Sequence, residues 1–133
     1  MRCVIAILAI SVVPSAALAT GEIFCEAPDA AAQFGYTFGT VPGIALVSAS
    51  FTANGQSWAT TASGGTPEPD VTPVAVAQAA YDSGQTLIDF VDPNFEQIVA
   101  SVRLVHADND AGFAIAGVLA VEGHGVWPMI CDG

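Results

Sequence analysis

The sequence predicts an all-β fold, either a small antiparallel β-barrel or a β-sandwich, with room for one or two short helices. Three observations support this prediction. Short segments rich in β-branched and aromatic residues recur along the chain, turn-forming residues separate them, and one cysteine lies near each end of the predicted mature domain. The length of 133 residues, with 53% hydrophobic residues, 13 Gly and 8 Pro, suits one domain with many turns.

Residues 1–19 have the pattern of a secretory signal peptide. One cation is followed by a short apolar run, a helix breaker and small residues before a cleavage site between Ala19 and Thr20. The apolar run is too short to cross the hydrocarbon core of a bilayer as a helix. We therefore expect a single exported domain over residues 20–133, in the periplasm or outside the cell.

The charge balance is strongly acidic. The chain has 13 Asp and Glu against 2 Lys and Arg, a formal net charge of -11. Loss of the signal peptide would leave 13 acidic residues and Arg103 as the single arginine, a formal charge of -12 with no lysine. Nucleic acids and anionic membranes attract clustered cations, so we expect neither as a partner of the mature protein. A basic protein is the kind of partner that this charge favours.

Two cysteines, Cys25 and Cys131, remain after signal cleavage. In an oxidising compartment, two cysteines without a third competitor most simply pair with each other. A redox or metal-binding role has less support because the pair lacks the CxxC spacing. We therefore expect a structural disulfide that joins the two ends of the domain.

The first half of the domain shows one strong hairpin signal. Residues 29–34 suit a short helical turn, and the alternation of aromatic residues that follows indicates extended chain. Asn54-Gly55 then separates residues 44–52 from residues 56–61, which are both rich in β-branched and aromatic residues. Because both central positions of a type I′ turn need positive φ, Asn-Gly in this setting predicts a β-hairpin.

The middle of the chain leaves a choice between helix and strand. Residues 62–73 contain three prolines and two adjacent glycines and predict a polar loop. Residues 74–81 fit a short helix capped by Thr72, but the turn at 82–84 and the convincing strand at 86–91 favour a second hairpin.

The last third of the chain predicts a further hairpin. A helical turn over 93–97 that leads into a strand ending near His106 reconciles the helical and alternating patterns there. A turn at 108–112 then precedes a strand over 113–121, with Phe113, Ile115, Leu119 and Val121 on one face. A glycine-flanked turn and a short extended segment complete the chain at Cys131.

Candidate metal ligands are weak. Asp108 and Asp110 lie in a turn that resembles the start of a calcium loop, but its glycine comes one position early and the bidentate Glu is missing, so an ordinary acidic turn explains it better. His124 shares a face with Glu122 if the segment is extended. The spacing identifies no third zinc ligand for this pair, and it identifies no partner ligands for His106. We expect no metal or cofactor.

No catalytic motif is present. The chain lacks a nucleophile elbow, a phosphate-binding loop and a dinucleotide fingerprint, so we expect a non-catalytic binding or structural protein of the cell envelope. One alternative is an inhibitor or scavenger of a cationic exported protein, such as a lysozyme-like hydrolase. Another is a barrel that binds a small ligand, although Trp58 and Trp127 are expected to fill the core or plug one end.

Overall fold

The computed structural model describes residues 21–40, 44–61 and 68–133, which contain strands and turns and no helix. The predicted signal peptide and the cleavage site between Ala19 and Thr20 lie outside these residues. Nine strands follow one another along the chain: β1 Gly21–Glu26, β2 Ala32–Gly39, β3 Ala45–Ala53, β4 Gln56–Thr60, β5 Val71–Asp82, β6 Gln85–Val91, β7 Ile98–Asn109, β8 Gly112–Val121 and β9 Gly125–Asp132.

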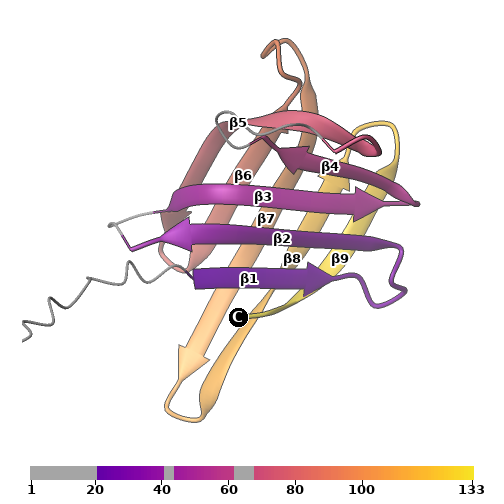
Figure 1. Ribbon diagram of the computed structural model, residues 1–133. Helices are drawn as coiled ribbons and strands as arrows, with labels where there is room; N and C mark the ends of the chain where they lie inside the picture. The colour runs from indigo at the N-terminus through magenta and orange to yellow at the C-terminus, as the bar shows by residue number, and fades with distance from the viewer. Residues whose placement is uncertain (1–20, 41–43, 62–67) are drawn as a thin grey trace, which may run out of the picture.

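The nine strands form one closed barrel in sequence order (Figure 1). Every neighbouring pair is antiparallel except β4 and β5, which run parallel. The predicted all-β barrel and its terminal disulfide are therefore both confirmed. Cys25 of β1 pairs in register with Cys131 of β9, and the two residues form the disulfide at the point where the barrel closes.

The interior follows the strand alternation, because successive side chains point to opposite faces of a sheet. In the middle of the barrel, Phe51 lies 5.1 Å from Phe90 and Phe34 lies 6.2 Å from Phe90, measured between ring centroids. All three rings are buried, and complete burial of such a side chain stabilises a fold by about 2–3 kcal/mol. The centre of the barrel is therefore filled.

The predicted hairpins are confirmed. Asn54 and Gly55 have φ of 49° and 80° between β3 and β4, as a type I′ turn requires. Residues 74–81 belong to β5, so the helical alternative is wrong there. The turn into β6 uses positive φ at Ser83 and Gly84.

Both predicted helical turns are wrong. Residues 29–34 hold a tight turn around Ala30, at φ 56°, and β2 already begins at Ala32. Residues 93–97 form an irregular loop in which Phe95 has φ 60°. The Asp92 carboxylate accepts backbone N–H bonds within this loop, as a helix cap would, but the positive φ prevents the chain from continuing as a right-handed helix.

One strand boundary also differs from the prediction. The loop expected to end at Pro73 ends earlier, because β5 begins at Val71 and pairs with β4 from there.

Nearer the C-terminus, the β7–β8 hairpin projects beyond the rest of the barrel (Figure 1). Phe113, Ile115, Leu119 and Val121 lie on one face of β8 as predicted, but Phe113 lies on this projection and is 61% exposed, whereas the other three are buried.

In the part of the chain that the structure describes, there is no helix of the length and apolarity that crossing a bilayer requires.

Candidate functional site

The two ends of the barrel are built differently. At the end that carries the β3–β4 and β8–β9 turns, Trp58 stacks on Phe51 with 5.2 Å between ring centroids, and the His124 ring meets the Trp58 ring edge-on at 5.1 Å. Trp127 is also buried at this end. The expectation that the two tryptophans fill the core is confirmed, and this end of the barrel is closed.

The opposite end contains a cavity of about 360 Å³, which we call the mouth cavity. It opens where β2, β5 and β7 end and the β7–β8 hairpin begins to project (Figure 1). Its lining residues are Ile23, Tyr36, Phe38, Gly39, Thr40, Ile44, Tyr81, Thr86 and His106. A concave, mainly apolar wall with a few polar groups is typical of a small-molecule site.

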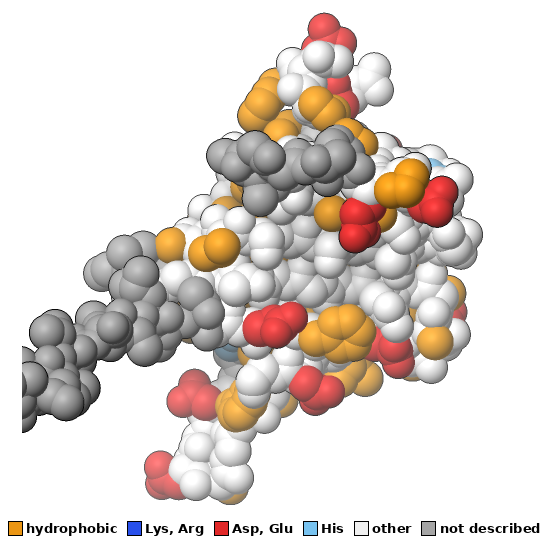
Figure 2. Space-filling model, viewed as in Figure 1, with side chains coloured by type: hydrophobic (Ala, Val, Ile, Leu, Met, Phe, Trp, Pro, Cys, Tyr) orange, Lys and Arg blue, Asp and Glu red, His pale blue; other side chains and the backbone are white. Residues whose placement is uncertain are grey.

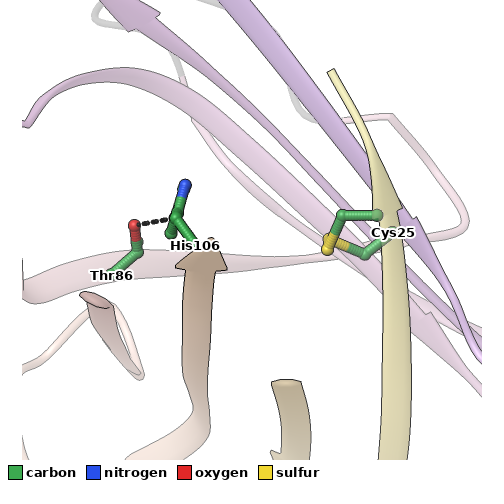
Figure 3. The surroundings of a disulfide bond; sticks show 4 residues. Cys25, Thr86 and His106 are labelled. Atoms are coloured by element: carbon green, nitrogen blue, oxygen red, sulfur yellow. Dashed lines mark hydrogen bonds between the residues drawn. A yellow bond between two sulfur atoms is a disulfide. The ribbon is translucent and has the colours of Figure 1, made fainter. Parts of the chain in front are cut away.

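The polar groups of the mouth cavity converge on its inner wall. Thr86 Oγ1 lies 2.8 Å from His106 Nε2, and Figure 3 shows the two side chains pointing toward each other. Thr86 is 1% exposed although it is polar. The Tyr81 ring meets the His106 ring edge-on, with 5.2 Å between ring centroids. This contact network fixes the position of His106.

The mouth cavity is uncharged at neutral pH. Burial lowers the pKa of His106 below its ordinary value of 6.5, which favours the neutral imidazole. Burial also raises the pKa of the Tyr36 hydroxyl, an effect that the neighbouring Thr86 side chain only partly offsets. Among the described residues, no Asp, Glu, Lys or Arg lines the cavity. It therefore offers neutral hydrogen-bond donors and acceptors but no counterion.

The sequence-predicted site residues do not come together. Asp108 and Asp110 lie on the projecting β7–β8 hairpin, whereas His124 lies at the closed end of the barrel beside Trp58. Among the described residues, no three His, Cys, Asp or Glu side chains gather closely enough to hold a metal ion.

Arg103 lies on the outer wall and not in the mouth cavity. Its Nη1 atom is 2.7 Å from Asp89 Oδ1, on the outward face of β6 and β7. The same Nη1 donates hydrogen bonds to the carbonyls of Val102 and Ile88. Asp89 Oδ1 is therefore attracted by the charge of Arg103 but accepts no well-directed hydrogen bond.

A second hollow, of about 500 Å³, lies on the outer face of β1 to β4. Gly35 leaves space at its centre, and serine and threonine hydroxyls surround it, with Phe24 at one side. Figure 2 shows carboxylates around this face and no cationic side chain among the described residues in view. Its floor is the outer surface of the sheet, and it is open to solvent to about the same degree as the mouth cavity.

His106 is a candidate ligand by its residue type alone, and its contact with Thr86 does not follow from its spacing. Thr86 shares an inward face with Ile88 and Phe90, and His106 shares one with Val102 and Leu104. A polar residue at the end of an inward-facing apolar series is a signal that the sequence contains. What the sequence does not show is that β6 and β7 place these two residues next to each other.

Fold and site together define a closed nine-stranded β-barrel with one filled end and one open end. No family model, curated protein or solved structure matches the chain, so its function has to be argued from this geometry.

Proposed function

We propose that the protein is a non-catalytic, exported barrel that binds a small, neutral and mostly apolar molecule in the mouth cavity. One observation carries the proposal: the barrel is packed with aromatic rings at its centre and at one end, while the other end keeps a cavity of about 360 Å³ with inward-facing polar groups. A barrel that served only as a scaffold would gain stability from filling this space as well.

The lining supports a ligand with an apolar body. Ile23, Phe38 and Ile44 supply apolar surface, and the transfer of a ligand's apolar area onto them is favourable by about 25 cal/mol per Å². The volume of the mouth cavity suits a molecule of one to three rings or a short aliphatic chain, because such sites bury most of their ligand.

The polar groups support a neutral end group. Thr86 and His106 can each donate or accept a hydrogen bond, and neither carries a charge at neutral pH. A carboxylate or phosphate would meet no cation among the described lining residues, inside a protein of strongly negative charge, and would lose its hydration without compensation. A hydroxyl, carbonyl or amine of low basicity avoids this cost.

The disulfide supports the exported location. Cys25–Cys131 joins the first and last strands, and such bonds persist in oxidising compartments. Together with the signal-like N-terminus, it favours a periplasmic or extracellular binding protein.

Two probes with the same ring skeleton test the proposal. N-phenyl-1-naphthylamine is neutral, and 8-anilino-1-naphthalenesulfonate adds one sulfonate to that skeleton. We expect the neutral probe to bind with a Kd on the order of 100 µM or tighter, measured by fluorescence enhancement. We expect the sulfonate to bind at least about tenfold more weakly.

Matched tryptophan variants locate the binding site. Ile44→Trp fills the mouth cavity and should abolish binding of the neutral probe, whereas Val47→Trp adds the same ring to the outer face of the barrel and should leave binding unchanged. Circular dichroism checks that both variants fold. Absence of binding to the natural sequence, equal affinity for the two probes, or unchanged binding to Ile44→Trp would each refute the proposal.

A further inference from the structure

The outer face of β8 and β9 is apolar along its middle, and β9 ends at the exposed Asp132. Three outward residues of β8 pair in register with three of β9: Ala116 with Ile130, Val118 with Pro128, and Ala120 with Val126. We call these six residues the β8–β9 face. Its largest side chains stand clear of the barrel, with Val126 68% and Ile130 63% exposed.

The outer face of β2 and β3 is polar by comparison. The outward residues of β2 and β3 are Gln33, Gly35, Thr37, Ser48, Ser50 and Thr52. Antiparallel strands with one solvated face normally show this alternation, and strands that are apolar on both faces are typically covered on both. The six side chains of the β8–β9 face expose on the order of 400 Å², within the range of the largest apolar patch on a typical soluble monomer, which is often a functional surface.

The rim of the β8–β9 face is acidic. Glu26 pairs with Ile130 on the β1 side, Asp132 continues β9, and Glu122 lies in the turn between β8 and β9. All three are exposed. Arg103 lies opposite Val118 on the β7 side, but Asp89 neutralises it. The unneutralised charges around the face are therefore all negative.

We infer that the β8–β9 face docks a basic protein whose contact surface has an apolar centre and a rim of Lys or Arg. An apolar core with a charged rim is the usual organisation of a protein interface, and opposite charges at the rim accelerate association. A second copy of this chain fits poorly, because it would bring the same acidic rim residues against one another. An anionic membrane is repelled for the same reason. This site is distinct from the mouth cavity and does not depend on it.

The test uses three basic proteins as probes, namely lysozyme, cytochrome c and ribonuclease A, immobilised for surface plasmon resonance. The natural sequence should bind at least one of them with a Kd below about 100 µM at about 20 mM NaCl. Binding should weaken at about 300 mM NaCl, because the rim charges are exposed and salt screens them.

A matched pair of substitutions distinguishes binding through the β8–β9 face from attraction through net charge alone. Val126→Asp and Val47→Asp each add one negative charge at an exposed strand valine, 68% and 62% exposed respectively. Attraction through net charge alone would leave both variants as tight as the natural sequence or tighter. If the partner docks on the β8–β9 face, Val126→Asp should weaken binding at least about tenfold, whereas Val47→Asp should not. Val126→Ile, which keeps the face apolar, should bind normally.

Four outcomes would overturn the inference. They are the absence of binding to all three probes, equal affinities of the two aspartate variants, self-association of the natural sequence in sedimentation that Val126→Asp abolishes, and Val126-dependent binding to phosphatidylglycerol vesicles. The third result would assign the face to a second copy and the fourth to a membrane. Thermal melts of every variant by circular dichroism confirm that the barrel is intact.

Discussion

Cys25 and Cys131 face each other directly across the seam of the barrel, with their Cα atoms 3.9 Å apart and a sequence separation of 106. The seam is short. Only three residue pairs join β1 to β9, whereas ten join β7 to β8. The disulfide therefore holds the barrel closed where the strand ladder has the fewest backbone contacts.

Removal of this bond should destabilise the protein strongly. In the chain-entropy model, a crosslink that closes a loop of this length stabilises the fold by about 4–5 kcal/mol, and loss of a native disulfide from a small exported domain costs about 2–5 kcal/mol. We expect Cys25→Ser/Cys131→Ser to lower the free energy of unfolding, measured in urea, by about 2–5 kcal/mol. Addition of reductant to the natural sequence should have the same effect. A free energy of unfolding that changes by less than about 1 kcal/mol would show that the seam holds without the bond.

Gly117 is the tightest point of the β7–β8 pair. A Cβ placed there would lie 1.9 Å from the Arg103 carbonyl oxygen and 2.8 Å from the Leu104 Cα atom, so the backbone would have to move. We expect Gly117→Ala to lower the free energy of unfolding by about 2–3 kcal/mol. Gly35→Ala is the control, because its nearest neighbour is 3.7 Å away, and it should change the stability little. Similar melting temperatures for the two variants would contradict this prediction.

The Arg103–Asp89 pair should contribute through Asp89. Burial alone would raise the pKa of Asp89, but contacts with Arg103, Gln78 and Ser101 outweigh it and lower the pKa below its ordinary value. Because Arg103 is 47% exposed, solvent screens the pair, and we expect Arg103→Met to cost about 1 kcal/mol.

Two measurements check this interpretation. In urea unfolding, Arg103→Met/Asp89→Asn should recover part of the loss, because the double variant no longer covers a carboxylate that lacks a counterion. Since the folded protein holds the pKa of Asp89 below about 3.8, the stabilisation should be present at neutral pH and disappear as the pH falls below that value. A double variant less stable than Arg103→Met would argue against a role for the covered charge.

The elements that the sequence predicted correctly are those fixed by local chemistry. Asn54-Gly55 specifies its turn through positive φ, and Cys25 and Cys131 are the two cysteines of the predicted mature domain. The errors have a different origin. Phe95 takes a backbone conformation that a bulky side chain rarely adopts, and the parallel pairing of β4 with β5 depends on strands that no local turn connects.

The mouth cavity was beyond the reach of the sequence for a related reason. Thr86 and His106 are 20 residues apart, and they meet because the register of β6 with β7 places Gln85 opposite Val105. Which residues of β6 and β7 lie opposite each other depends on the strand pairing of the whole barrel. The sequence therefore predicted the strands of the barrel but not which polar side chains lie together at its open end.

The last prediction concerns the pH dependence of stability at the mouth cavity. Burial lowers the pKa of His106 below 6.5, so the unfolded chain binds a proton more readily than the folded protein as the pH falls through 6.5. The free energy of unfolding should therefore decrease from about pH 7.5 to about pH 5 by more in the natural sequence than in His106→Gln, which lacks this titration. Val105→Gln, which alters the exposed neighbour and keeps His106, should retain the slope of the natural sequence. Thermal melts across this range provide the comparison, and identical slopes for all three proteins would mean that the imidazole is as solvated in the folded barrel as in the unfolded chain.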